Sequence, residues 1–210
     1  MKTENKIKMK TGILFSGGKD SCYAAFLAKK EGYEISCLIA IESQNKESYM
    51  FHTPFIDKVF LQASLMNIPL VYLKTKGEKE KELSDLEKAI KIAIKKYKIN
   101  GIITGAMESI YQASRVQKIC NKLNIECFNP LWQKNAYVHW KDLLKNNFKV
   151  IIASVSADGL DKKWIGKEID EKILEELKKL SEKYKFHLGF EGGEAETFVT
   201  FCPLFKAKII

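Results

Sequence analysis

The sequence predicts an α/β protein with a parallel, doubly wound sheet of five strands, followed in the chain by a smaller α/β unit. Short apolar runs alternate with helical patterns over the first 130 residues, which is the order that parallel βαβ units require. The run 35–41 shows little alternation of polar and apolar residues, as expected of a strand covered on both faces. The pattern changes near Pro130, so we predict an N-terminal domain (1–130) and a C-terminal domain (131–210).

The N-terminal elements follow from the spacing of apolar residues. Residues 19–30 carry apolar side chains at helical spacing, and Gly32 ends that helix. A second amphipathic pattern runs from Leu83 to Tyr97. The expected strands are 12–15, 35–41, 69–73, 101–104 and 125–128, and the expected helices are 19–30, 55–66, 83–97 and one that buries residues 116–123.

The C-terminal elements are fewer. We expect a helix near 138–146, a buried strand at 150–155 and a glycine-punctuated turn over 159–166. A long amphipathic helix follows, with apolar residues from Ile169 to Tyr184. The last strand is expected at 197–201.

The composition is that of an ordinary globular protein, with 46% hydrophobic and 29% charged residues. The net charge of +9 is distributed rather than blocked, which indicates a solvated, lysine-rich surface. The first ten residues carry lysines without an apolar stretch behind them, so no secretory signal is expected, and no apolar run has the ~18 residues that a membrane span needs. The five cysteines are widely spaced, which predicts a reduced, cytoplasmic protein without a disulfide framework or zinc knuckle.

A glycine pair lies where the first strand meets the first helix. Adjacent glycines let the backbone turn sharply, and a helix start behind them offers unpaired N–H groups and a positive dipole end, so the stretch predicts a phosphate site. It is not a Walker loop, because Ile13 and Asp20 occupy key positions of that pattern. The alternative is a plain turn in which Asp20 complements the helix dipole. The predicted phosphate-binding residues are Ser16, Gly17, Gly18, Lys19, Asp20 and Ser21.

A second glycine corner, Gly105-Ala106, follows the fourth strand and leads into a polar helix start. This repeats the geometry of the first corner, so both could serve one ligand. Arg115, in the helix behind it, is the only arginine of the chain. A single guanidinium among lysines suggests a place where bidentate pairing matters, although drift in a lysine-biased composition remains the alternative.

The loop after the second strand lies where open α/β sheets bind ligands. Its Tyr49, Phe51 and His52 could face a substrate, or the aromatic rings could anchor the loop to the core while His52 bonds a helix start. The residues alone do not favour either reading.

An acidic block near the end carries Glu191, Glu194 and Glu196 around Gly192-Gly193. Such carboxylates could hold Mg²⁺, recognise a cation or act as a general base. An exposed acidic turn before the last strand would have the same composition, and composition alone favours that turn.

The stretch Ser16–Ser21 resembles the pyrophosphate-binding loop of the N-type ATP pyrophosphatases, the PP-loop superfamily with the adenine nucleotide alpha hydrolase-like fold. Within that superfamily the chain is similar, over nearly its whole length, to the diphthine–ammonia ligase family in its short archaeal-type form. Four residues depart from the usual pattern of that family: Ile110, Gln117, Ala195 and Phe201. The motifs that carry the likeness are Ser16–Ser21; Tyr49-Met50-Phe51-His52; Gly105-Ala106 with Ser109, Tyr111-Gln112 and Arg115-Val116; Pro130-Leu131-Trp132; Gly159-Leu160 and Gly166; and Glu191–Thr197 with Cys202-Pro203-Leu204-Phe205.

The resemblance implies an amidation that uses ATP: a carboxylate attacks the α-phosphorus, and ammonia then displaces AMP from the acyl-adenylate. Gly17, Gly18 and Lys19 would hold the phosphates with Gly105 beside them, Asp20 would lie near Mg²⁺, and Arg115 would face the developing charge. The catalytic carboxylates would be Glu191, Glu194 and Glu196. The expected substrate-binding residues are Tyr49, Phe51, His52, Ser109, Tyr111, Trp132, Gly192, Gly193 and Thr197.

The implied acceptor is diphthine, a modified histidine on translation elongation factor two, whose trimethylammonium group suits aromatic and acidic neighbours. Ammonium is a further substrate, no membrane is expected to be involved, and a homodimer is left open. One alternative is a relative that adenylates a tRNA base, although Cys120 and Cys127 read as core residues rather than a thiolation pair and no nucleic-acid appendage is present. The other is a non-catalytic ATP-binding protein.

Overall fold

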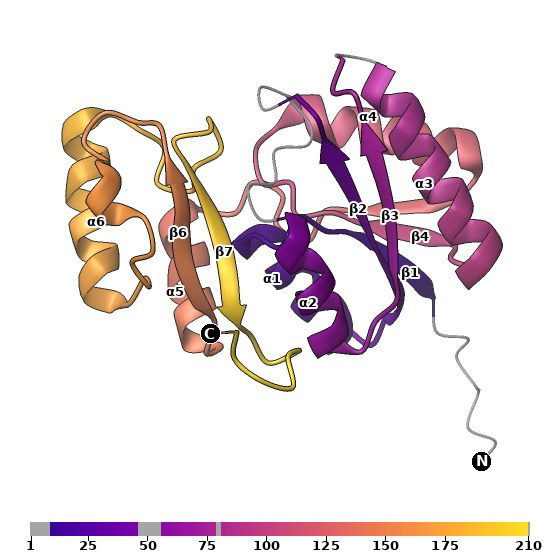
Figure 1. Ribbon diagram of the computed structural model, residues 1–210, viewed down its shortest axis with the longest axis horizontal. Helices are drawn as coiled ribbons and strands as arrows, with labels where there is room; N and C mark the ends of the chain where they lie inside the picture. Colours follow the sequence, from indigo (N-terminus) through magenta and orange to yellow (C-terminus); the bar gives the residue numbers. More distant parts are fainter. Residues whose placement is uncertain (1–8, 46–55, 79–80, 210) are drawn as a thin grey trace.

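The computed structural model describes residues 9–45, 56–78 and 81–209 (Figure 1). Its larger sheet has the strand order β3-β2-β1-β4-β5, with every neighbouring pair parallel. The predicted α/β class and five-stranded parallel sheet are therefore confirmed. The chain moves outward in one direction from β1 to β3 and in the other from β4 to β5, so the topological switch lies between β1 and β4. The strands are β1 (Lys10–Leu14), β2 (Glu34–Ser43), β3 (Leu70–Thr75), β4 (Gly101–Ile103) and β5 (Glu126–Phe128).

Helices cover both faces of this sheet (Figure 1). Helices α1 (Lys19–Lys30) and α2 (Ile56–Met66) lie on one face, and α3 (Lys81–Tyr97) and α4 (Ile110–Leu123) lie on the other. Successive strand residues point to opposite faces, and accordingly Leu38 joins the core of the first face whereas Ile39 joins the core of the second. Both faces are buried, which explains the continuous apolar run in β2.

The C-terminal part contains an antiparallel pair, β6 (Lys149–Val155) and β7 (Ala195–Phe201). Helix α5 (Ala136–Lys145) precedes this pair, and α6 (Glu171–Tyr184) lies between its strands in the chain. The glycine-punctuated turn contains a short 3₁₀ helix, η1 (Lys162–Trp164), that spacing did not predict. Asp161 caps it by accepting a hydrogen bond from the Lys163 N–H at 2.9 Å.

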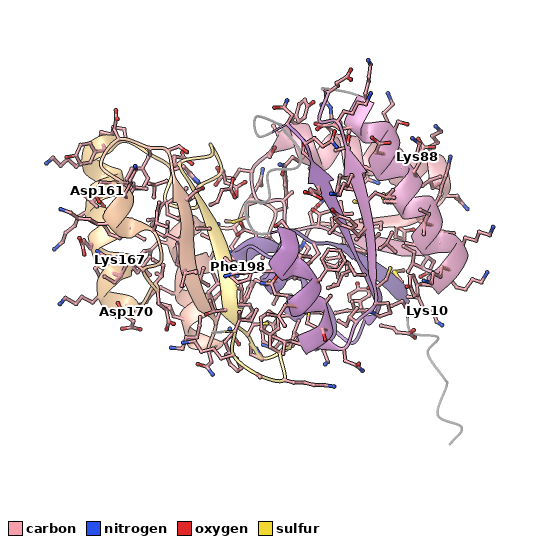
Figure 2. All side chains as sticks on the ribbon, in the orientation of Figure 1. Lys10, Lys88, Asp161, Lys167, Asp170 and Phe198 are labelled. Carbon is pink, nitrogen blue, oxygen red and sulfur yellow. The ribbon has the colours of Figure 1, made fainter. Side chains whose placement is uncertain are left out.

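One hydrophobic core joins the two parts. Phe148 packs edge-on against Tyr23 and Phe26 of α1, with ring centroids 5.3 and 5.6 Å away. Figure 2 shows Phe198 of β7 where the C-terminal sheet meets α2, and the Lys58 Nζ of α2 lies 5.6 Å from the centroid of its ring. Side chains from before and after residue 130 therefore share one core. The domain boundary predicted at that residue stays a prediction.

No helix among the described residues has the length and hydropathy needed to cross a membrane. The loop residues Tyr49, Phe51 and His52 lie outside the described residues, so their predicted substrate contacts remain predictions.

Candidate active site

The predicted phosphate loop follows β1 at the carboxyl edge of the sheet, beside the switch between β1 and β4. Gly17 has φ +79°, a conformation that favours glycine. Its carbonyl accepts hydrogen bonds from Val199 N at 3.1 Å and from Gln62 Nε2 at 3.0 Å. The loop is thus held in one shape by β7 and α2 together.

The two serines of the loop have different surroundings. Ser21 is buried; its Oγ donates to the Gly18 carbonyl at 3.1 Å and accepts from the Ser16 N–H at 3.3 Å. Ser16 is exposed, with its Oγ 3.3 Å from the Ser21 Oγ. Ser21 therefore shapes the loop, whereas Ser16 presents a hydroxyl on its open side.

The Lys19 side chain is 2% exposed and does not face the open side of the loop. Its ammonium donates to the Gly189 carbonyl at 2.7 Å and to Asp20 Oδ2 at 2.8 Å, and it lies near the rings of Trp140 and Phe190. Its backbone N–H donates to Thr197 Oγ1 at 3.2 Å. Both groups join the C-terminal part to α1 in this structure, and the contact of Lys19 with phosphate stays a prediction.

Asp20 lies between two basic side chains. Its Oδ2 accepts from Lys19, and its Oδ1 lies 2.9 Å from Nε2 of His139 on α5, which is fully buried. Burial opposes its negative charge, but the Lys19 charge and the His139 hydrogen bond outweigh burial and lower the pKa of Asp20. The network joins α1 to α5 through a carboxylate that stays ionised.

Asp20 does not fit the predicted role of Mg²⁺ ligand. Both of its oxygens are engaged by nitrogen groups of Lys19 and His139. Among the described residues, no group of three or more His, Cys, Asp and Glu side chains could hold a metal ion. We therefore derive no step of the reaction through Mg²⁺.

The acidic block folds onto the phosphate loop. Lys19 of the loop donates hydrogen bonds to Gly189, just before the block, and to Thr197, at its end. Burial, and then the negative charge of Asp20, raise the pKa of Glu191. Glu191 Oε2 accepts from the Glu108 N–H at 3.4 Å. Glu191 is partly buried rather than fully exposed, which favours a site residue over a plain exposed turn. Its predicted catalytic role stays a prediction.

The other two carboxylates of the block have different surroundings. Glu194 Oε1 accepts from the His187 N–H at 2.9 Å and Oε2 from the Gly192 N–H at 2.8 Å, so this side chain closes the turn. Glu196 precedes Thr197 in β7, and neighbouring strand residues point to opposite faces. Glu194 thus closes the turn, and Glu196 is expected to leave β7 on the side away from Thr197; the catalytic roles predicted for both stay predictions.

The glycines of the block form its turn. Gly193 has φ +81°, with its N–H 3.3 Å from the Phe190 carbonyl, and both Gly192 and Gly193 are exposed. Their predicted contact with a substrate stays a prediction. His187, which sequence reasoning passed over, lies beside them with its Nε2 3.5 Å from Glu108 Oε2.

The second glycine corner touches the first. A Cβ added to Gly105 would lie 2.7 Å from the backbone carbon of Asp20, so only glycine lets the two corners approach this closely. Ser109 caps α4 by accepting from the Gln112 N–H at 3.3 Å. Arg115 stacks on Tyr111, with its Cζ 3.4 Å from the ring centroid, so one face of that ring is covered.

Trp132 lies in a groove of about 470 Å³ beside the second corner. Its side chain is 38% exposed, and Asn129, at the carboxyl end of β5, lines the same groove. The roles predicted for Trp132, Tyr111, Ser109 and Arg115 toward a substrate stay predictions. The groove is lined by Ile110, Ala113, Ser114, Gln117, Asn129 and Trp132.

Sequence reasoning missed two buried polar residues of the site, Gln62 and His139. Both occupy positions on the apolar face of a helix: Gln62 shares a face with Val59 and Met66, and His139 adjoins Trp140 in α5. A polar side chain within an apolar helix face was the available signal, since buried polar groups need a partner.

Comparison with known proteins shows the family. The model of the diphthamide synthase N-terminal domain matches residues 9–127, and that of the diphthamide synthase C-terminal domain matches residues 135–210. A mouse protein named diphthine–ammonia ligase is 37% identical over 224 residues, covering 96% of this chain and 82% of its own length. The human protein of that name is 36% identical with the same coverage.

A solved structure with partial likeness is the U34-tRNA thiolase NcsA from Methanococcus maripaludis. It has a TM-score of 0.42 and 17% sequence identity, covering 89% of this chain and 70% of its own. That likeness is too distant to carry function. The two domain models and the relatives, which span nearly the whole chain, establish that the chain belongs to the diphthamide synthase family.

Proposed function

We propose that the protein is an ATP-dependent ligase that converts diphthine on translation elongation factor two to its amide, with ammonia as the nitrogen donor. The supporting observation is the contact between the acidic block and the phosphate loop, made by Thr197 Oγ1 with the Lys19 N–H at 3.2 Å. It brings a partly buried carboxylate, Glu191, next to a loop of the kind that binds phosphate. The relatives named diphthine–ammonia ligase match over both regions.

The reaction has two displacement steps. An oxygen of the diphthine carboxylate attacks the α-phosphorus of ATP, and the bond to the β-phosphate oxygen breaks, which gives an acyl-adenylate and pyrophosphate. Ammonia then attacks the acyl carbon, AMP leaves with the electron pair of the broken C–O bond, and a proton is released. Positioning and charge stabilisation carry most of such chemistry.

The loop around Gly17 and Gly18 is the proposed cradle for the pyrophosphate leaving group. Gly18 is the N-cap residue of α1 and has no side chain with which to cap it, so the dipole end of this helix faces the loop, while the Lys19 N–H is taken by Thr197 Oγ1. The exposed Ser16 hydroxyl adds a donor. Mg²⁺ accompanies ATP in this proposal, but Asp20 is not its ligand.

Glu191 is the proposed proton acceptor for ammonium. A carboxylate whose pKa is raised by burial and by Asp20 is a stronger base than an exposed one and still ionises. Its negative charge also attracts ammonium and the trimethylammonium group of diphthine. Glu191 is the one residue of the acidic block to which we assign a chemical role.

The acceptor side of the site is proposed to extend from the second corner. Arg115 would approach the carboxylate or the α-phosphate, and Trp132 and Tyr111 would lie near the quaternary ammonium. Ser109, Gly192 and Gly193 complete this side, with Tyr49, Phe51 and His52 from the loop outside the described residues. The substrate is a translation factor and the cysteines are free, so we place the reaction in the cytoplasm.

A tRNA-thiolation role is not supported by the cysteines. Cys120 is fully buried and Cys127 packs against the same core, on the α3 and α4 face of the sheet. Both thiols thus belong to the hydrophobic packing rather than to the carboxyl edge of β1.

The test is the formation of AMP and pyrophosphate from ATP by the purified protein with diphthine-bearing elongation factor two and ammonium. We expect AMP formation to require both the factor and ammonium, and the factor to gain an amide by mass spectrometry. AMP formation that does not depend on the factor would remove the substrate assignment. ATP binding without AMP formation would favour a non-catalytic role.

A further inference from the structure

Gln62 is a fully buried polar residue in α2, next to the buried apolar residues Val59 and Ala63. Its Nε2 donates to two carbonyls, Gly17 O at 3.0 Å and Val199 O at 2.8 Å. Both N–H groups of the amide are thus used, and they join the phosphate loop to β7. Burial of an amide is unfavourable without such partners.

The Gly17 carbonyl is held from two sides, since the Val199 N–H also donates to it at 3.1 Å. In a trans peptide group the C=O and the following N–H point in opposite directions. Anchoring the Gly17 carbonyl on α2 and β7 therefore turns the Gly18 N–H away from them. The contact of the Gly18 N–H with Ser16 Oγ, at 3.4 Å, agrees with this, because Ser16 lies on the exposed side of the loop.

The acceptor end of Gln62 has no comparable role. Its Oε1 lacks a hydrogen-bond partner within the described part of the chain. A Cβ added to Gly17 would lie 2.4 Å from this oxygen, so Oε1 packs closely against Gly17. A buried acceptor without a donor costs stability. Gln62 therefore contributes its two N–H donors and its close packing on Gly17.

We propose that Gln62 is a positioning residue for the phosphate loop. It holds the Gly17 carbonyl so that the Gly18 N–H faces the terminal phosphates of ATP, which leave as pyrophosphate. Gln62 itself touches no substrate. The inference rests on the proposed use of ATP and adds the residue that keeps the loop in its binding geometry.

The experiment compares the binding of three ligands to Gln62→Met by isothermal titration calorimetry. Methionine keeps the length of the side chain but donates no hydrogen bond. We expect the dissociation constants for ATP and pyrophosphate to rise by about tenfold, the size of one or two lost hydrogen bonds. AMP lacks the terminal phosphates, so its dissociation constant is expected to change by less than about twofold on the same reasoning.

Thr11→Val is the matched control. Thr11 is also fully buried, and its Oγ1 donates to the Glu34 carbonyl at 3.1 Å, in the first half of β1 and away from the loop. This variant loses a buried donor of the same kind, but it is expected to bind all three ligands as the wild type does.

Equal weakening of ATP and AMP binding, or unchanged pyrophosphate binding, would overturn the role of Gln62. Should Gln62→Met not fold, Gln62→Asn is scored in the same way, since its shorter amide cannot reach both carbonyls. Failure of the wild type to bind ATP would count against the proposed function instead. In that case the dissociation constants for pyrophosphate of the wild type and Gln62→Met still test the role of Gln62.

Discussion

The two strand-to-helix corners look alike in sequence but are built differently. At the first corner the N-cap of α1 is Gly18, which provides no side-chain cap, and Gly17 adopts a positive φ. At the second corner Ser109 caps α4 with its own hydroxyl, and Gly105 serves to pack against Asp20. A helix start that is capped by its own side chain has less need of an external anion. The pattern of strand, glycine and helix thus predicts both corners, whereas the difference in capping favours the first corner as the proposed phosphate site.

The largest effect is expected when the first corner is broken by Gly17→Ala. The added Cβ would overlap Gln62 Oε1 at 2.4 Å, and φ +79° is strained for alanine. We expect AMP formation to fall by about a hundredfold or more, because misplaced phosphates lose the aligned geometry. Steady-state kinetics with saturating factor and ammonium measure this.

Gly166→Ala is its matched control, since Gly166 has φ +83° and no atom within 4 Å of an added Cβ. It introduces the same backbone strain in the C-terminal turn without a clash. We expect some loss of thermal stability but normal turnover. Similar loss of activity in both variants would mean that backbone strain, not the shape of the phosphate loop, limits the reaction.

Glu191→Gln tests the part of the site that the acidic block brings to the first corner. Removal of a general base is expected to lower kcat by about 10²-fold or more. The pKa of Glu191 is raised from 4.5 by burial and by Asp20, so the wild type should lose activity on the acid side at a pH above that value. The pH–rate profile of the variant should lack this acid limb.

Glu196→Gln is the comparison for that prediction, because Glu196 lies in the same block but on the strand face away from Thr197. We expect it to keep both kcat and the acid limb. An acid limb that persists in Glu191→Gln would assign the proton acceptor to another group.

His139→Gln tests the link between the first corner and α5 through the stability of the fold. Burial, with the positive charges of Lys19 and Lys134, lowers the pKa of His139 from 6.5 against the pull of Asp20. As pH falls through about 6.5, His139 binds a proton in the unfolded chain but not in the folded protein, so the free energy of unfolding decreases. The lowered pKa of Asp20 acts only below 3.8, outside this window.

Urea unfolding of both proteins between pH 5 and 8 gives the comparison. We expect the wild type to lose more stability than His139→Gln on acidification, because the variant has no imidazole to protonate. Parallel pH dependence of the two proteins would show that His139 is protonated equally in the folded and unfolded states.

The smallest effect is expected at the second corner, from Ser109→Ala. Loss of the cap to the Gln112 N–H should cost about 1 kcal/mol of stability. The dissociation constant for ATP is expected to remain unchanged, since Ser109 caps α4 and not α1. A large change in ATP binding would mean that both corners hold the nucleotide.

Much of the fold, and the stretches that form the candidate site, could be recognised because local patterns mark them. The order of strands and helices, the glycine corner at Gly17 and the acidic block all follow from short stretches of sequence, and α1 has the bounds that spacing predicted. The roles of individual side chains could not be predicted in the same way. Lys19 and Glu194 looked like ligand-binding groups, but each is used up by backbone partners that lie far away in the chain or across a turn.

The sequence by itself determined the α/β class and the order of strands and helices, because these depend on periodicity along the chain. It also indicated the family, through motifs spread over nearly its whole length. Only the tertiary structure decided that β7 and α2 fix the Gly17 carbonyl, that Lys19 and His139 enclose Asp20, and that Glu191 is partly buried. The physical reason is that a polar side chain has several partners of equal chemistry available to it. Packing across long sequence separations chooses among them.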